Sequence, residues 1–155
     1  MNHQVLLVFL KEKIKDPDIL WLLEKVLQSF HSENGDGKGI PLGNLTSQVF
    51  ANIYMNELDQ FITTKLLQAP LIKNQLKVKY YVRYADDFVI LATSNKYFGQ
   101  YISLIKEFLM QNLKLELHPK KVSIGTLAAG VDFLGWVHFF GHRVLRTTAK
   151  RRMFR

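Results

Sequence analysis

Apolar residues recur along the chain with two different spacings, which predict where helices and strands form. Spacings of three and four residues, typical of one helix face, run through 44–66 and 96–111. Another helix is expected to begin at Asp16, its N-cap, with Pro17 as its first helical residue. Residues 5–14 are expected to be the end of a helix or a packed connector. Amphipathic helices of this kind need an apolar surface to pack against.

The helix over 44–66 is expected to divide its side chains between packing and ligand contact. Its apolar face is formed by Leu45, Val49, Phe50, Ile53, Tyr54, Leu58, Phe61 and Ile62. Ser47 and Gln48 are expected largely outside that face, and Asp59 on the solvent side. A helix start exposes free N–H groups that suit a phosphate, and Asn44 is the expected N-cap. The alternative is a well-capped amphipathic helix that only packs.

Strands are expected where β-branched and aromatic residues dominate. Residues 80–91 contain two such runs on either side of Asp86 and Asp87, which predicts a hairpin. A kink is expected at Gly135, where the missing side chain would permit close approach of another backbone. Shorter strands are expected at 113–117, at 122–124 and on both sides of the kink within 131–140.

The two adjacent carboxylates are the strongest chemical signal in this pattern. Side chains of a regular strand alternate between faces, so Asp86 and Asp87 share a target only if a turn interrupts the strand. Two neighbouring like charges are easiest to explain if a cation lies between them. Asp is also common in turns because its side chain bonds nearby backbone N–H groups. A metal site and an ordinary hairpin with a polar tip both remain open.

The composition narrows the class of protein. A chain of 155 residues that is 48% hydrophobic suits one domain with a packed core. The net charge of +8 predicts a polyanionic partner, with an acidic membrane surface or a merely basic soluble protein as alternatives. Without cysteine there is no disulfide or thiolate metal site. No apolar run approaches the ~20 residues of a membrane span. A cytoplasmic location without membrane contact is therefore expected.

Three segments, in this order, resemble a reverse transcriptase palm. They read GIPLGNLTSQVFANIYMNELD at 39–59, YVRYADDFVIL at 81–91, and LKLELHPKKVSIG with GVDFLGW at 113–125 and 130–136. The Tyr-Ala-Asp-Asp tetrad is short, but its position between the other segments makes it highly specific. The chain is most similar to bacterial enzymes of the group II intron, retron and diversity-generating retroelement type, the last above all.

The resemblance implies an RNA-directed DNA polymerase that extends a DNA primer on an RNA template with deoxynucleoside triphosphates. Two Mg2+ ions, or Mn2+ in their place, serve nucleotidyl transfer in such enzymes. The implied metal ligands and catalytic residues are Asp86 and Asp87, with Lys121 near the triphosphate. Nucleotide and template contacts are implied at Pro41, Gly43, Ser47, Gln48, Tyr84 and Ala85. The implied primer grip is Phe133, Leu134, Gly135 and Trp136. Contacts to the nucleic-acid backbone are expected at Arg143, Arg146, Lys150, Arg151 and Arg152, unless these only form a solvated helix face.

The expected fold class is α+β, a polymerase palm. Its antiparallel sheet would have the Asp-Asp hairpin at the centre and the helices 44–66 and 96–111 packed on one face. A partial palm domain is expected over 1–141, and the basic start of a thumb or a connector over 142–155.

The family pattern also has parts that this sequence does not match. It includes another metal-binding Asp on a strand before the first helix, and Met1-Asn2-His3 resembles only the tail of that element. Finger segments and most of a thumb are not matched either. A palm fragment that does not polymerise alone is therefore expected, with a missing N-terminal segment of the same enzyme as a candidate partner. The alternatives are an inactive nucleic-acid-binding remnant and a module that completes a partner chain. The reading frame upstream of Met1 would discriminate among them.

Overall fold

The computed structural model of the chain describes residues 1–29, 39, 45–67 and 78–154. The chain divides into two compact units, Met1–Leu117 and His118–Arg155. Both combine helices with a small antiparallel sheet, which confirms a mixed α and β architecture. No helix within the described ranges has both the length and the apolar character needed to cross a membrane.

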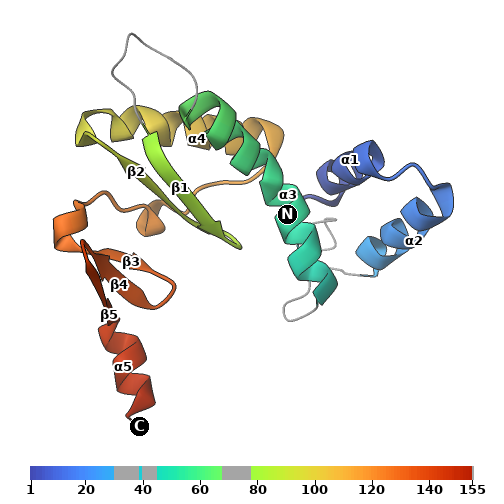
Figure 1. Ribbon diagram of the computed structural model, residues 1–155. Coiled ribbons are helices and arrows are strands. Elements are labelled where there is room, and N and C mark those ends of the chain that lie inside the picture. Colours follow the sequence, from blue (N-terminus) through green and yellow to red (C-terminus); the bar gives the residue numbers. More distant parts are fainter. Residues whose placement is uncertain (30–38, 40–44, 68–77, 155) are drawn as a thin grey trace. The chain divides into compact units, whose positions relative to one another are not determined.

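The first unit is built from helices and one hairpin (Figure 1). Its helices are α1 (His3–Lys13), α2 (Pro17–Gln28), α3 (Leu45–Phe61) and α4 (Phe98–Asn112), and its strands are β1 (Val78–Tyr84) and β2 (Asp87–Ala92). A π-helical segment continues α3 over Ile62–Leu67, and a 3-10 turn over Asn95–Tyr97 precedes α4.

The second unit is built from three strands and a short helix. They are β3 (Val131–Phe133), β4 (Trp136–Phe139), β5 (His142–Leu145) and α5 (Thr147–Met153), preceded by 3-10 turns at Pro119–Lys121 and Leu127–Ala129. The strands form an antiparallel sheet in the order β3-β4-β5. The expected change from palm to thumb after residue 141 falls in the turn between β4 and β5, and this domain division stays a prediction.

Local capping sets the start of α2 as the sequence predicts. The Asp16 carboxylate accepts hydrogen bonds from the backbone N–H groups of Asp18 at 2.9 Å and Ile19 at 3.2 Å. Residues 5–14 belong largely to α1, so the helical alternative for them is correct. Before α4, the Ser94 hydroxyl accepts a hydrogen bond from the Lys96 backbone N–H at 3.3 Å within the 3-10 turn, and α4 begins at Phe98.

The buried stripe of α3 is rotated from the expected one. Phe50, Tyr54 and Leu58 are at most 3% exposed and lie four residues apart along one side of the helix. Ser47 continues that row one turn earlier, and Met55 is buried beside it. Leu45 and Val49, expected in the core, lie on another side and are 74% and 50% exposed. The prediction that Ser47 lies outside the packed face is therefore wrong.

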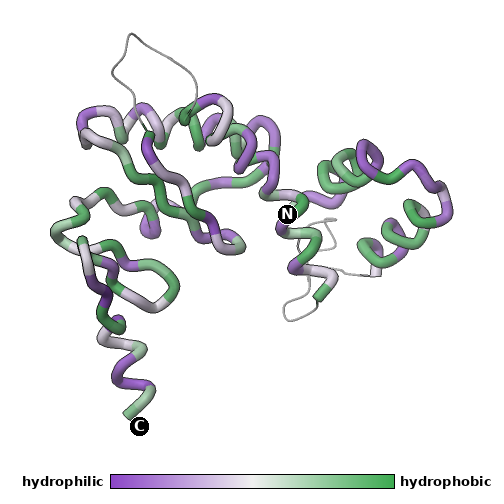
Figure 2. Tube along the Cα trace, in the orientation of Figure 1, coloured by the Kyte–Doolittle hydropathy of each residue, from purple (hydrophilic) through white to green (hydrophobic). Residues whose placement is uncertain are grey.

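The predicted hairpin is present, and its register fixes the turn. Tyr84 pairs with Asp87, so the loop consists of the two residues Ala85 and Asp86. Within the described residues β1 and β2 form a sheet of their own rather than the centre of a larger one. One face of the hairpin, which includes Tyr81 and Phe88, packs against the core that α3 and α4 share. Figure 2 shows β2 hydrophobic over most of its length, β1 mixed, and hydrophilic residues at the turn end of the hairpin.

The predicted strand over 113–117 does not form, although its alternation is real. Leu113 is fully buried, and Leu115 and Leu117 pack against the core, as the pattern predicts. Lys114 has φ +48°, which breaks the extended backbone, and no described strand pairs with this segment. The buried hydroxyl of Tyr54 donates to the Leu113 carbonyl at 2.5 Å instead.

Residues 122–124 do not form the predicted strand either. Ile124 is 55% exposed, and the segment is irregular in the structure. Without a buried face or a described partner strand, a short apolar run has nothing to hold it extended.

The expected kink at Gly135 is instead a hairpin turn. Leu134 and Gly135 have φ +54° and +81° and connect β3 to β4. No atom of the described residues lies within 4 Å of where a Cβ would stand on Gly135, so among them the expected close backbone approach is not found. The crowded glycine is Gly130, where a Cβ would lie 2.6 Å from a methyl of Val137.

Candidate catalytic turn and nucleic-acid interface

The two carboxylates lie at and beside a strained two-residue turn. Asp86 is its second residue and Asp87 begins β2, and both side chains are exposed. Ala85 has φ +53°, while Asp86 does not have a positive φ. A positive φ at the first central residue alone is the pattern of a type II′ turn, where glycine is usual. A non-glycine residue in this conformation costs about 1–2 kcal/mol, so the turn needs support from neighbouring groups.

The hairpin face that points away from the helices carries aromatic and acidic side chains together. Tyr80, Val82 and Tyr84 alternate along β1 and are 64%, 54% and 63% exposed. Asp87 lies opposite Tyr84 on this same face. Two carboxylates therefore lie at the end of an exposed, partly aromatic surface.

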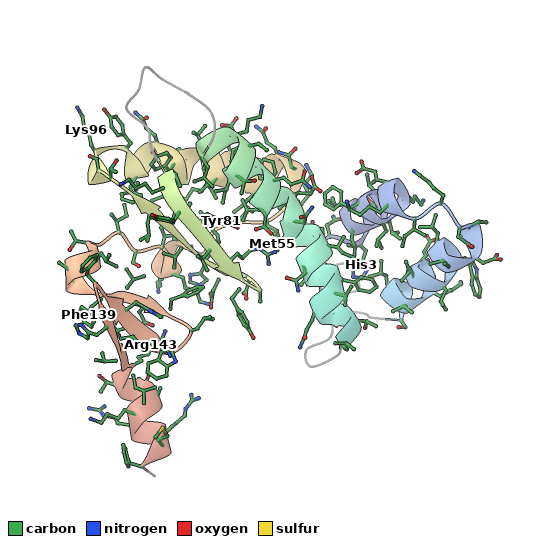
Figure 3. All side chains as sticks on the ribbon, viewed as in Figure 1. His3, Met55, Tyr81, Lys96, Phe139 and Arg143 are labelled. Carbon is green, nitrogen blue, oxygen red and sulfur yellow. The ribbon has the colours of Figure 1, made fainter. Side chains whose placement is uncertain are left out.

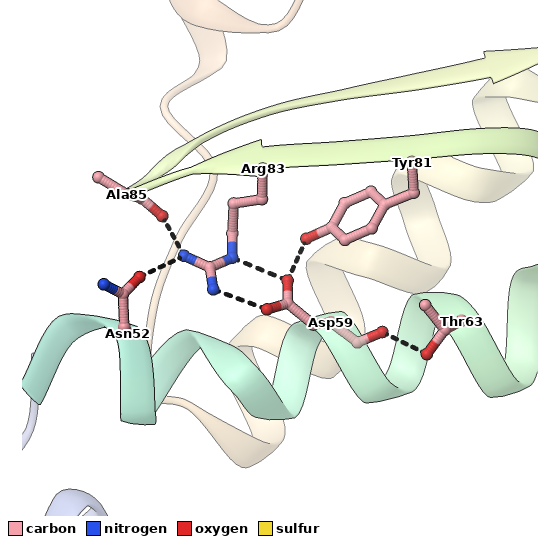
Figure 4. Close-up of polar contacts among 6 residues, drawn as sticks. All are labelled: Asn52, Asp59, Thr63, Tyr81, Arg83 and Ala85. Carbon is pink, nitrogen blue, oxygen red and sulfur yellow. Dashed lines mark hydrogen bonds and ion pairs between the residues drawn. The ribbon is translucent and has the colours of Figure 1, made fainter. Parts of the chain in front are cut away.

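The opposite face of the hairpin is tied to α3 by one charged network (Figure 4). Arg83 donates from Nε and Nη2 to the two carboxylate oxygens of Asp59, at 2.7 Å and 2.6 Å. Tyr81 donates its hydroxyl proton to Asp59 Oδ1 at 2.7 Å. The Arg83 and Asp59 side chains are 11% and 29% exposed, so the ion pair is largely shielded from water. Paired N–H···O bonds of this kind are stronger and more directional than single ones.

The ionisation of the network follows from these contacts. Burial alone would raise the pKa of Asp59, but the hydrogen bonds from Arg83 and Tyr81 hold it below its ordinary value of 3.8. The hydrogen bond to Asp59 raises the pKa of Arg83. Burial, together with the hydrogen bond to Asp59, raises the pKa of Tyr81 well above its ordinary value. The network therefore consists of a carboxylate, a guanidinium and a neutral phenol at neutral pH.

The same guanidinium reaches the strained turn. Arg83 Nη1 donates to the backbone carbonyl of Ala85 at 2.7 Å and to Asn52 Oδ1 at 3.1 Å. Asn52 and Asp59 both belong to α3, two turns apart along the helix. One side chain thus connects the helix to the backbone of the residue before Asp86.

The residues predicted to contact nucleotide and template are only partly described. Pro41 and Gly43 lie outside the described residues. Ser47 is 4% exposed, and its hydroxyl forms no hydrogen bond with the part of the chain that the structure describes. Gln48, one position on, is exposed. The predicted contacts of all four residues stay predictions.

In the second unit, Trp136 and Asp132 each hold one of the predicted backbone-binding arginines. The Arg143 guanidinium lies over the ring of Trp136, 4.7 Å from its centroid (Figure 3 labels Arg143). Arg146 forms an ion pair with Asp132. The other predicted primer-grip residues are Phe133 in β3 and the turn residues Leu134 and Gly135. The other predicted cations are exposed: Lys121 lies at a 3-10 turn, and Lys150, Arg151 and Arg152 lie on α5.

The donor set at the turn fits a hydrated Mg2+ ion. Mg2+ prefers oxygen ligands, keeps several waters and is commonly held by one or two carboxylates together with substrate phosphates. Asp86 and Asp87 offer such oxygens on an exposed turn. Among the described residues there is no group of three or more His, Asp or Glu side chains placed to hold a metal.

Sequence reasoning missed Asp59, Asn52 and Arg83. Asp59 was expected on the solvent side of its helix, and its ion pair shows that this is wrong. The sequence signal for this network was in β1, because Arg83 lies two residues after Tyr81 and therefore on the same hairpin face, which packs on the helices. A charged side chain on a packed face needs a partner, so Arg83 predicts a carboxylate on the covering helix.

Comparison with known proteins identifies the family. The reverse transcriptase (RNA-dependent DNA polymerase) family matches residues 4–138. Protein YkfC of Escherichia coli (strain K12) is 26% identical, over 97% of this chain and 45% of its own length. The group II intron-encoded protein LtrA of Lactococcus lactis subsp. cremoris is 26% identical, over 88% and 32%. The putative COX1/OXI3 intron 2 protein of Saccharomyces cerevisiae is 24% identical, over 86% and 22%.

This chain spans less than half the length of these curated relatives. Two of the three are named as intron proteins, which agrees with the resemblance to intron-encoded enzymes. With most of its residues matched, from α1 through the Asp-Asp hairpin into β4, the chain belongs to the reverse transcriptase family.

Proposed function

We propose that this chain is the palm portion of an RNA-directed DNA polymerase and carries two of its catalytic carboxylates, Asp86 and Asp87. The observation that supports this most is the exposed Asp-Asp turn at the end of a hairpin that is fixed to α3 on its other face. A rigid element with reactive groups at its tip is how proteins hold catalytic groups in place.

Asp86 and Asp87 hold divalent ions in this proposal, Mg2+ being the natural choice for two exposed carboxylates. Bound Mg2+ supplies charge neutralisation and activation of the primer 3′-hydroxyl in phosphoryl transfer. Tyr84 and Ala85 shape the turn beside the primer end. Lys121, an exposed cation, neutralises the triphosphate or protonates the leaving pyrophosphate.

The proposed substrates are an RNA template, a DNA primer and deoxynucleoside triphosphates. The net charge of +8 and the exposed Lys150, Arg151 and Arg152 of α5 support contact with phosphate backbones. Arg143 and Arg146 are oriented by Trp136 and Asp132, which leaves their remaining N–H groups available for phosphate oxygens.

Primer extension on an RNA template tests this proposal. We expect a polypeptide extended through the reading frame upstream of Met1 to incorporate nucleotides, and Asp86→Asn to abolish incorporation. Glu107→Gln is the matched control, because it removes an exposed carboxylate on α4 whose one hydrogen bond within the described residues comes from Gln111. Incorporation that survives Asp86→Asn would refute the catalytic assignment.

Binding of an RNA–DNA hybrid, measured beside primer extension, separates the polymerase from the inactive remnant. Both predict salt-sensitive affinity that Arg151→Glu with Arg152→Glu lowers similarly for different sequences. Only the polymerase predicts that Asp86→Asn removes activity while hybrid binding persists. Affinity that does not change between low and moderate salt would contradict the nucleic-acid interface itself.

A further inference from the structure

The Arg83 guanidinium forms more hydrogen bonds than its ion pair with Asp59 requires. Nε and Nη2 bind the two oxygens of Asp59, and Nη1 binds Ala85 O and Asn52 Oδ1. Two groups fix the orientation of Asp59 itself, because Tyr81 donates to the same carboxylate from the neighbouring inward position of β1. The planar guanidinium is thus bound to α3 through Nε and Nη2, and its Nη1 donates to the turn.

The acceptor on the turn is the carbonyl of a strained residue. Ala85 carries the positive φ of +53° that a glycine would adopt without cost. A strained backbone conformation persists only where surrounding contacts determine it. Within the described residues, the Arg83 side chain connects the turn to α3, because it binds both Ala85 O and Asp59.

We propose that Arg83, Asp59 and Asn52 are positioning residues that hold the Ala85–Asp86 turn in its metal-binding conformation. The inference rests on the proposed function of Asp86 and Asp87 as metal ligands and adds how α3 sets their placement. Arg83 fixes the peptide that leads into Asp86, so the direction of that carboxylate depends on a helix distant in sequence. Asp59 orients the guanidinium, and Asn52 keeps Nη1 over the carbonyl.

A lysine cannot replace Arg83 in this role. Lysine keeps the charge and can pair with Asp59, but its single ammonium lacks the spread fork that serves both Asp59 and Ala85. Arg83→Lys therefore keeps an ion pair with Asp59 but removes the hydrogen bond that supports the turn. Ala85→Gly provides the converse test, because glycine adopts the positive φ without support.

The experiment uses the 155-residue chain and Mn2+ as the probe ion. Paramagnetic broadening of the Asp86 and Asp87 amide signals in an NMR titration reports the affinity of the turn for the ion. We expect Arg83→Lys to weaken this affinity about tenfold, as removal of groups that orient metal ligands commonly does. Adding Ala85→Gly to Arg83→Lys should recover most of the loss. Glu107→Gln, remote from the network, should leave the affinity within about twofold of the original.

A purely structural role for Arg83 predicts a different outcome. It would lower the urea midpoint without changing the Mn2+ affinity of the folded protein, and Ala85→Gly would not restore what Arg83→Lys removes. Either result would overturn the inference. Amide relaxation dispersion gives a metal-free readout: Arg83→Lys should produce microsecond-to-millisecond exchange at Ala85 and Asp86, and its absence counts against positioning.

Asp86→Asn distinguishes the failure of this inference from failure of the proposed function. Broadening that is missing in the unsubstituted chain, or that survives Asp86→Asn, would refute the metal assignment. If Asp86→Asn abolishes broadening while Arg83→Lys leaves it unchanged, the carboxylates bind metal but the positioning role of Arg83 is wrong.

Discussion

Replacement of Asp59 by asparagine should destabilise the first unit strongly, although the two side chains have nearly the same shape. Asparagine keeps one acceptor for Arg83 but removes the second acceptor and the negative charge that balances the guanidinium. Removing one partner of a buried ion pair costs about 3–5 kcal/mol. The Asp59 side chain is 29% exposed and Arg83 11%, so water screens part of the loss. We therefore expect about 2–3 kcal/mol, close to the value of a charged hydrogen bond.

The loss should depend on pH in a direction set by the pKa of Asp59. Because this pKa lies below its ordinary 3.8 in the folded chain, the unfolded chain binds the proton first as pH falls. The stabilisation is fully present above the ordinary value and is lost as pH falls through the lower, folded-state value. The difference in unfolding free energy between the original chain and the Asp59→Asn variant should therefore shrink in acid.

Urea unfolding followed by far-UV circular dichroism measures this difference, because helices of the first unit dominate the signal. Asp59→Asn and the original chain are compared at about pH 7 and about pH 3, where linkage predicts a large and a reduced difference. Glu107→Gln makes the same chemical change at an exposed position and should stay within about 0.5 kcal/mol. An Asp59→Asn loss no larger than this control at neutral pH would refute the role given to the ion pair.

Further predictions concern buried groups and crowded glycines. Tyr54→Phe should cost about 1–3 kcal/mol in urea unfolding, because it leaves the Leu113 carbonyl without its buried donor; an unchanged midpoint would contradict this. Gly130→Ala should destabilise the second unit more than Gly135→Ala, as measured by fluorescence of Trp136. Both glycines have positive φ, but only Gly130 has atoms within 3 Å of the added methyl group. Equal losses of stability in the two variants would show that the positive φ, and not the crowding at Gly130, sets the cost of the added methyl group.

The features that the sequence predicts correctly are those that local chemistry determines. The Asp16-Pro17 start of α2 depends on a side chain and the two N–H groups that follow it, and it forms as expected. The hairpin around Asp86 forms because two β-rich runs flank a loop of two residues. Such signals need no knowledge of the rest of the chain.

The predictions that failed depend on partners distant in sequence. Residues 113–117 alternate correctly, but a strand also needs a neighbour to accept its hydrogen bonds, and periodicity cannot supply one. Leu45 and Val49 fit a helical stripe, but only packing decides which side of α3 is covered. Asp59 looked solvent-exposed because its partner, Arg83, lies on a strand more than twenty residues later.

The charge balance of the network also supports the proposed role of the turn in cation binding. An arginine one residue before the Tyr-Ala-Asp-Asp turn could neutralise the carboxylates beside it and lower their affinity for metal. Here Asp59 takes the Arg83 charge, and within the described residues neither Asp86 nor Asp87 forms an ion pair. Two uncompensated carboxylates at one tip repel each other, and a divalent cation relieves that repulsion. Asp59 thus keeps the guanidinium available for the Ala85 carbonyl and away from the Asp86 and Asp87 carboxylates.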